Sequence, residues 1–370
     1  MACEGELVTP TVPKFRPHPS NSSSAPPKDY SERDGKDALD SLLRIYRMAR
    51  HSLKHYKCKE AIKAYSLLPE NHRESPYVLH KVGLAYFEMS DYEEAKVKLE
   101  EMHRKDRGRM EGLEILSTVY WHLKKEVELS SLAREASDRD KLSPETWCVV
   151  GNCYSLQKEH DLAIKFFQRS TQIKPSFTYG YTLTAHEYVA NEDFDKAISC
   201  FRKAIKTNSN HYNAWYGLGA IYYRQEKFCL SEYHFRKALS INPSSSILHC
   251  HLGMVLHASK KFYDALKVLS TAFALSPNNP QACFQKANVL ISLENYPEAL
   301  ESLEHVLHHA PREASVHFLI GKVQKKLGRT DEALKAFVTA LDLDPKDSNM
   351  IKGRIDRLDE EEIEEDVSGF

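Results

Sequence analysis

Residues 212–243 read YNAWYGLGAIYYRQEKFCLSEYHFRKALSINP, and this stretch decides the fold. Trp215 and Tyr222 are two helical turns apart, so they lie on one face of a first helix, with Leu-Gly between them on the same face. A second apolar series starts at Phe235 and predicts a second helix. Pro243 marks the end of that helix, because proline cannot continue it. The stretch therefore predicts a pair of helices.

The same pattern recurs every 34 residues along most of the chain, which is the tetratricopeptide-repeat signature. With Tyr212 counted as a first position, repeats are predicted to start at Leu42, Pro76, Met110, Pro144, Thr178, Tyr212, Ser246, Pro280 and Ala314. The eighth position is small in all nine repeats, as it must be where two helices cross closely. One helix pair cannot bury its apolar stripe alone, so repeats stack. We predict an all-α tetratricopeptide-repeat superhelical solenoid of about nine 34-residue helix-turn-helix repeats with a C-terminal capping helix.

Aromatic and capping residues carry two further expectations. Trp147 and Trp215 are expected in the packed core between helices. The pairs Ser75-Pro76, Ser143-Pro144 and Asn279-Pro280 predict helix starts, since a capping side chain followed by proline suits a first turn. The third repeat, 110–143, is the least regular.

Composition predicts four segments along the chain. Residues 1–36 are rich in proline and serine and are expected to be disordered. Residues 37–347 form the repeat array, and residues 348–358 continue its apolar stripe as a capping helix. Residues 359–370 are an acidic disordered tail.

Several functional classes are not expected. The formal charge of −1 argues against non-specific nucleic-acid binding, which needs a basic face. No apolar run reaches the roughly 18 residues of a membrane span. The eight cysteines form no CxxC pair, so neither zinc nor a disulfide framework is indicated. No nucleophile, base or metal constellation is evident, so we expect no enzyme activity and no cofactor.

First helices line the concave side of such a solenoid, and the second, fifth, ninth and twelfth positions of each repeat form what we call the first-helix face. In the middle of the chain this face mixes amides, aromatics and small residues, with acids nearby, which suits an extended peptide. The candidate peptide-binding residues are Glu145, Cys148, Asn152, Tyr179, Thr182, His186, Glu187, Asn213, Tyr216 and Tyr223. Asn152 is the most informative, because its amide can bond a peptide carboxylate or backbone. A solvated polar residue is an equally good interpretation of Asn152.

Three stretches go beyond the demands of the repeat itself. They are SPETWCVVGNCYSLQKEHDLAIKFFQRS (143–170), HYNAWYGLGAIYYRQEKF (211–228) and FLIGKVQKKLG (318–328). They resemble the C-terminal repeat array of the tetratricopeptide scaffold subunit of the anaphase-promoting complex, the subunit that receives Ile-Arg tails. The likeness covers roughly residues 40–350.

This resemblance implies a scaffold subunit of a large ubiquitin ligase in the nucleus and cytoplasm, acting in cell-cycle-dependent ubiquitination with other subunits of the complex. Its groove would capture the C-terminal Ile-Arg tails of β-propeller co-activators and of the Doc-domain subunit. Asn152 matches a groove Asn of the family. The tail Arg would pair with Glu145 or Glu187, and the Ile would lie near Tyr216. The family dimerises through an additional N-terminal repeat block, which is not expected before Leu42, so the homodimer is left open.

An alternative is another tetratricopeptide adaptor, such as a chaperone-docking co-factor with a carboxylate clamp. That clamp needs basic residues on its helices. The matching positions are Cys148 with Asn152, then Leu183, then Asn213 and Gly217. The basic residues are missing there, which favours the scaffold.

Overall fold

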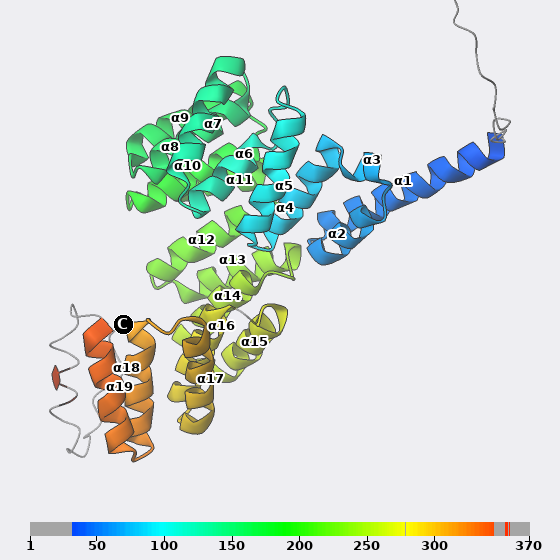
Figure 1. The fold of residues 1–370 in the computed structure, drawn as a ribbon. Helices are drawn as coiled ribbons and strands as arrows, with labels where there is room; N and C mark the ends of the chain where they lie inside the picture. Colours follow the sequence, from blue (N-terminus) through cyan, green and yellow to red (C-terminus); the bar gives the residue numbers. More distant parts are fainter. Residues whose placement is uncertain (1–31, 278, 344–351, 354, 356–370) are drawn as a thin grey trace, which may run out of the picture. The chain divides into compact units, whose positions relative to one another are not determined.

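The computed structural model describes residues 32–277, 279–343, 352, 353 and 355. All regular secondary structure in these residues is helical (Figure 1). The helices are α1 (Glu32–Lys54), α2 (Cys58–Ser66), α3 (Glu70–Arg73), α4 (Pro76–Glu88), α5 (Tyr92–Lys105), α6 (Leu113–His122), α7 (Glu126–Arg139), α8 (Pro144–Leu156), α9 (His160–Ile173), α10 (Thr178–Ala190), α11 (Phe194–Thr207), α12 (Tyr212–Arg224), α13 (Phe228–Ile241), α14 (Ser246–Ala258), α15 (Phe262–Leu275), α16 (Pro280–Ser292), α17 (Tyr296–His309), α18 (Ala314–Lys326) and α19 (Thr330–Leu343). The chain divides into residues 1–44 and residues 45–370, and α2 to α19 belong to the second unit.

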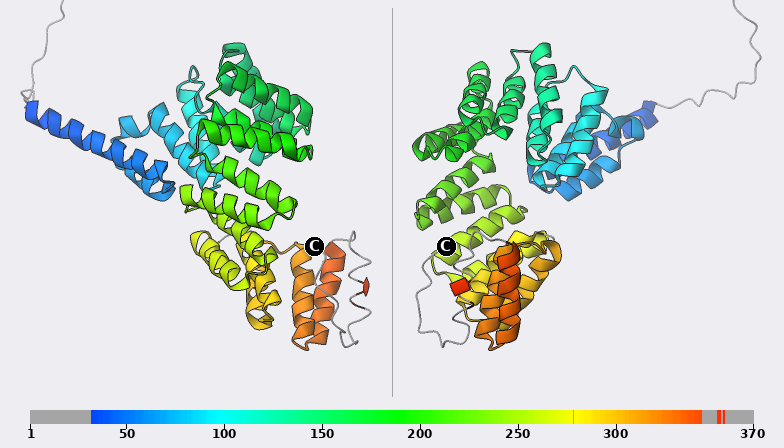
Figure 2. Two further views of the ribbon diagram at one scale, coloured as in Figure 1. Left: turned by 180° about the vertical axis from the view of Figure 1, so that it is seen from behind. Right: turned by 60° about the vertical axis from the view of Figure 1, so that its left-hand side comes forward.

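From α4 onward the helices come in pairs, and Figure 2 shows the two members of each pair side by side. The first helix of a typical pair has 13 residues and the second has 14. First helices begin at the residues where the 34-residue count places a repeat start, which are Pro76, Pro144, Thr178, Tyr212, Ser246, Pro280 and Ala314. The predicted architecture of stacked helix pairs is confirmed.

Close approach within a pair explains the small eighth position. A Cβ atom added to Gly321 would lie 2.8 Å from the ring of Phe337, and one added to Gly83 would lie 2.6 Å from Leu99. Both large residues sit on the second helix of the same pair. A side chain at the eighth position would therefore push the two helices apart.

The turn inside each pair uses a left-handed residue at a fixed place. From repeat to repeat this residue is Tyr56, Ser90, Lys124, Lys158, Glu192, Glu226, Lys260, Glu294 and Gly328. The left-handed region suits glycine, yet only the last of these turns has one. The following backbone N–H bonds back into the first helix, as Lys227 does to Tyr222 at 2.9 Å. The turn geometry is thus kept at a cost in backbone strain.

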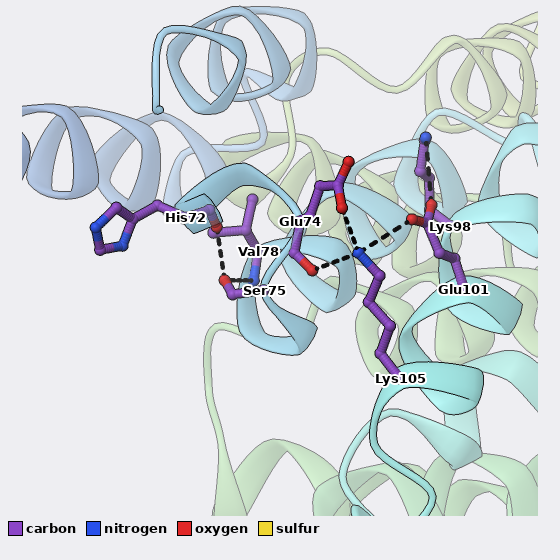
Figure 3. Close-up of polar contacts among 7 residues, drawn as sticks. All are labelled: His72, Glu74, Ser75, Val78, Lys98, Glu101 and Lys105. Atoms are coloured by element: carbon purple, nitrogen blue, oxygen red, sulfur yellow. Dashed lines mark hydrogen bonds and ion pairs between the residues drawn. The ribbon is translucent and has the colours of Figure 1, made fainter. Parts of the chain in front are cut away.

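Two of the three predicted caps form. The Ser75 side chain accepts from the Val78 N–H at 3.4 Å, and Asn279 accepts from Gln281. Figure 3 shows the Ser75 cap together with an adjoining group of polar contacts around Lys105. Ser143 caps nothing, because its hydroxyl donates to the Glu145 carboxylate instead.

The third repeat is the least regular, as its sequence indicated. Its first helix, α6, has only 10 residues. It begins at Leu113, after Gly112, whose φ of 102° prevents an earlier start.

The expectation that Trp147 and Trp215 lie in the core is wrong in part. Both are half-buried, and each indole N–H donates to a carbonyl of the preceding loop. The distances are 2.9 Å to Lys141 and 3.0 Å to Ser209. An indole needs a hydrogen-bond partner for its N–H, and this holds the ring at the edge of the core.

The ends of the array differ from the sequence expectation at one place. Helix α1 begins at Glu32, so residues 32–36 are helical although they were expected to be disordered. Helix formation is cooperative, so a helix extends past the last residue of its apolar stripe. Most of residues 348–358 and all of residues 359–370 lie outside the described part. Ile355 packs against the cluster that contains Phe337, as a capping segment requires.

Candidate peptide-binding surface

The ten candidate residues lie on three consecutive first helices. Glu145, Cys148 and Asn152 are on α8. Four more are on α10, and Asn213, Tyr216 and Tyr223 are on α12. The structure therefore brings the candidates to neighbouring elements, but it gives them different degrees of access.

Asn152 is a structural link between helices. Its side chain is 3% exposed, and Nδ2 donates to Ser117 Oγ at 2.8 Å and to Thr118 Oγ1 at 3.0 Å. Thr118 Oγ1 also contacts Tyr179 Oη at 2.7 Å. These bonds join α6, α8 and α10, and they occupy the amide hydrogens that a peptide carboxylate would use.

Glu187 is similarly committed. Oε1 accepts from Ser155 Oγ at 2.7 Å, and Oε2 lies 2.7 Å from His160 Nδ1. Ser155 also accepts a bond from the Trp121 indole at 3.0 Å. Glu187 is 8% exposed, so it offers little surface to the side chain of a tail Arg.

Two further candidates are buried. Cys148 is 0% exposed and packs in a cluster with Phe167. Burial raises the pKa of the Cys148 thiol well above its usual range. Thr182 is 2% exposed and donates to the Tyr179 carbonyl at 2.8 Å. A ligand on the first-helix face does not reach either side chain in this structure.

The other candidates remain accessible. His186 has an exposed edge, and its ring meets Phe201 edge-on at 5.2 Å. The pKa of His186 is lowered to about 4, chiefly because desolvation by the surrounding protein disfavours the charged ring, and also because His122 is near. The ring is therefore neutral at physiological pH. Asn213 is half-buried, and its side-chain amide has no hydrogen-bond partner among the described residues. Asn213, rather than Asn152, therefore offers the free amide that could bond a peptide carboxylate or backbone.

The aromatic candidates on α12 form an apolar wall. Tyr216 is half-buried, contacts Phe235 at 5.8 Å between ring centroids, and places its hydroxyl 3.1 Å from His251 Nε2. Tyr223 is half-buried against Phe228 at 5.9 Å. A small aliphatic side chain could pack against these rings.

Acidic groups missed by the sequence reasoning lie one and two repeats earlier. Glu114 on α6 accepts from the Gly112 N–H at 2.8 Å, and its pKa is raised to about 7 by burial and by Glu145. Glu88 on α4 accepts from Tyr212 Oη at 2.7 Å, and burial raises its pKa to about 7. Among the described residues, no Lys, Arg or His side chain forms an ion pair with Glu88, Glu114 or Glu145.

Glu114 could have been found from the sequence. It holds the fifth position of its repeat, which belongs to the first-helix face, whereas the ten predicted residues all lie in later repeats. Glu88 holds the thirteenth position, outside that pattern, so the repeat count does not identify it.

The bond between Tyr212 and Glu88 joins first helices four repeats apart. The ring of Tyr56 also meets the ring of Tyr212 edge-on at 5.2 Å. Side chains of α12 therefore contact α4 and the turn before α2, although 124 residues separate the hydrogen-bonded pair.

The described residues contain no group of three or more His, Cys, Asp or Glu side chains arranged to hold a metal ion. In the same part of the chain, no helix is long and apolar enough to cross a membrane.

Comparison with known families finds tetratricopeptide repeats along the array. The matches, each described as "Tetratricopeptide repeat", cover residues 144–177, 182–246, and 256–323 with 290–353. Together with the helix pairs, they confirm the predicted tetratricopeptide-repeat fold.

Curated relatives share much higher identity than the repeat alone requires. "Anaphase-promoting complex subunit 3" of Schizosaccharomyces pombe is 41% identical over 202 residues, covering 55% of this chain and 30% of that protein. "Protein bimA" of Emericella nidulans is 51% identical over 169 residues, covering 46% and 21%. "Cell division cycle protein 27 homolog" of Homo sapiens is 51% identical over 145 residues, covering 39% and 18%. The aligned part thus spans less than a third of each relative.

Among solved structures, the chain resembles one titled "Crystal structure of APC/C hetero-tetramer Cut9-Hcn1". The TM-score is 0.69 at 18% identity, covering 81% of this chain and 59% of that one. At this identity the likeness shows the fold alone.

Proposed function

Because the chain belongs to the tetratricopeptide-repeat proteins and is similar to subunit 3 of the anaphase-promoting complex, we propose that it is a scaffold subunit of such a ubiquitin ligase. It would act in cell-cycle-dependent ubiquitination and contact other subunits of the complex. The observation that carries the proposal is the identity of 41–51% over 145–202 residues to the named relatives. Repeats that share only their structural signature need not agree so closely, because the repeat fixes few positions.

The proposed role is non-catalytic and needs no cofactor. A scaffold works by holding partners, and stacked repeats offer long surfaces for that purpose. The place of action would be the nucleus and cytoplasm, as in the family that the sequence resembles.

The first-helix face is the proposed receptor for C-terminal Ile-Arg tails of β-propeller co-activators and the Doc-domain subunit. Glu145, with Glu114 beside it, would pair with the tail Arg, since both lack a cationic partner. Asn213 would donate to the terminal carboxylate, and the Ile would pack against Tyr216. Asn152 and Glu187 would support the face through their hydrogen bonds rather than touch the tail.

Assembly is tested by co-purification. The tagged chain, expressed in dividing cells, is expected to bring down the other subunits of the complex and ubiquitin-ligase activity. A matched control is the chain with Gly321→Trp, which blocks the close helix crossing in the ninth repeat. Recovery of no other subunit by a folded, helical wild-type chain would contradict the scaffold role.

A further inference from the structure

A group of exposed cations lies on the second helices, away from the first-helix face. The following six residues form what we call the basic stripe: Lys165 and Arg169 on α9, Arg202, Lys203 and Lys206 on α11, and Lys237 on α13. Arg169, Lys203 and Lys237 are 34 residues apart and so hold the same position in successive repeats. Equivalent positions of stacked repeats face the same way, so the three side chains share one surface.

The basic stripe lacks acidic partners. No carboxylate of a described residue forms an ion pair with any of its six side chains. Their contacts are neutral: Arg169 donates to the Gln172 side chain at 3.2 Å, and Arg202 donates to Tyr222 Oη at 3.4 Å. Lys237 lies over an aromatic ring at 5.9 Å. No ion pair within the described part of the chain therefore neutralises the positive charges of the basic stripe.

The same position is acidic in the preceding repeats. There it is Glu101 on α5 and Glu135 on α7, and each pairs with a cation of its own helix. Helix dipoles favour cations in a last turn, but Lys206 is the sole member of the basic stripe in one. The stripe is thus a local departure from the surface pattern of the array.

The middle of the stripe is hollowed. An open concavity of about 460 Å³ is lined by Asp195, Ile198, Ser199, Arg202, Lys203 and Lys206. Ile198 gives it one apolar side chain beside three cations and a single carboxylate, that of Asp195. Such a site can take the backbone and one side chain of an extended segment, with anionic groups on the cations.

We propose that the basic stripe docks an acidic, extended segment of a partner protein. Carboxylates of that segment pair with cations of α9, α11 and α13, and one of its side chains enters the concavity on α11. A peptide is favoured over nucleic acid, because Ile198 in the concavity offers an apolar contact that a peptide side chain can use and a phosphate cannot. The inference is independent of tail binding, which uses the first helices.

The test uses the full chain and a labelled short peptide of alternating glutamate and serine, followed by fluorescence anisotropy at low salt. The variant Arg169→Ala/Lys203→Ala/Lys237→Ala removes one exposed cation from each helix. The control Lys63→Ala/Lys267→Ala/Lys335→Ala removes three exposed cations of other second helices and changes the net charge equally. We expect the first variant to bind about tenfold more weakly and the control to stay within about twofold of the wild type.

Two results would overturn the proposal. Equal losses in both triple variants would show attraction by bulk charge alone. Binding of a single-stranded oligonucleotide of matched charge, with no binding of the peptide, would assign the stripe to nucleic acid. Circular dichroism of all variants checks that the helices are intact, which exposed substitutions should leave unchanged.

Discussion

Asn152 connects three first helices through one buried amide. Its two amide hydrogens are donated to Ser117 and Thr118, and the Thr118 hydroxyl also forms a hydrogen bond with the Tyr179 hydroxyl. Removing the amide would break two buried hydrogen bonds between α8 and α6, which costs more than the loss of an exposed bond. The stability of this part of the face therefore depends on Asn152.

We predict that Asn152→Ala lowers the free energy of unfolding by about 1–3 kcal/mol, measured by urea denaturation. Asn213→Ala is the matched control, since its amide has no partner among the described residues. It should change the free energy of unfolding by less than about 0.5 kcal/mol. Equal effects of the two substitutions would contradict the structural role of Asn152.

Glu88 and Glu114 make stability depend on pH. The pKa of each is raised from 4.5 to about 7, mainly by burial. The native chain keeps these protons to about pH 7, whereas the unfolded chain loses them near pH 4.5. Their contribution to stability is therefore complete below about pH 4.5 and is lost as the pH rises to about 7.

Glu88→Gln should remove the part of this pH-dependent loss of stability that is due to Glu88, because glutamine does not titrate. The glutamine oxygen still accepts the hydrogen bond from Tyr212. We expect the stability of the variant relative to the wild type to increase between pH 4.5 and pH 7. Urea denaturation at several pH values measures it, with Glu159→Gln, an exposed glutamate, as control. A difference that does not change with pH would mean that the pKa of Glu88 is ordinary.

At the residue level, sequence patterns located the surface better than the role of each side chain. The repeat position correctly placed Tyr216 and Asn213 on first helices. It could not tell that Asn152 and Glu187 would find partners on neighbouring helices, because those partners come from other repeats. Hydrogen bonding between repeats depends on three-dimensional packing, which a position count does not contain.

At the scale of the element, the turn within each helix pair is the feature with stored strain. Glu226 has φ of 57°, and the same turn of the ninth repeat has Gly328 at 76°. A left-handed conformation costs a residue with a side chain about 1–2 kcal/mol, whereas glycine adopts it freely. The gain from glycine is partly offset by its greater freedom in the unfolded chain.

We predict that Glu226→Gly raises the free energy of unfolding by about 0.5–1 kcal/mol and that Gly328→Ala lowers it by a similar amount. Thermal and urea denaturation measure both. A lower free energy of unfolding for Glu226→Gly would show that the left-handed conformation of Glu226 is not strained.

Helix starts and pairings were predictable, because period, proline and small residues are local signals. The start of α8 at Pro144 is an example. The short α6 was foreseen only as an irregularity, since its start depends on the conformation of Gly112. The extension of α1 back to Glu32 was missed, because cooperative helix formation continues beyond the apolar pattern.

At the scale of the molecule, the bond between Tyr212 and Glu88 links repeats that are far apart in sequence. Most contacts in a repeat array join adjacent repeats. The bond between Tyr212 and Glu88 therefore couples the unfolding of α12 to that of α4, although they are not adjacent in the array. Sequence reasoning missed it, since no pattern within one repeat encodes a partner four repeats away.

A double-mutant cycle with Tyr212→Phe and Glu88→Ala measures that coupling, because each substitution removes one partner of the hydrogen bond. We expect a coupling energy of about 1–2 kcal/mol, because the bond lies in a partly buried place. Tyr263→Phe, which alters an exposed tyrosine, combined with Glu88→Ala is the control and should show no coupling. Additive effects of Tyr212→Phe and Glu88→Ala would show that this hydrogen bond does not couple the two repeats.

Calorimetric titration of the full chain with a peptide ending in Ile-Arg tests most directly whether the first-helix face receives a C-terminal tail. We predict saturable binding that is lost when the peptide carboxylate is amidated and weakened about tenfold or more by Glu145→Gln or Asn213→Ala. Glu159→Gln and Asn71→Ala, at exposed positions elsewhere, should bind as the wild type does. No binding by the folded wild-type chain, or equal binding of the amidated peptide, would contradict the claim.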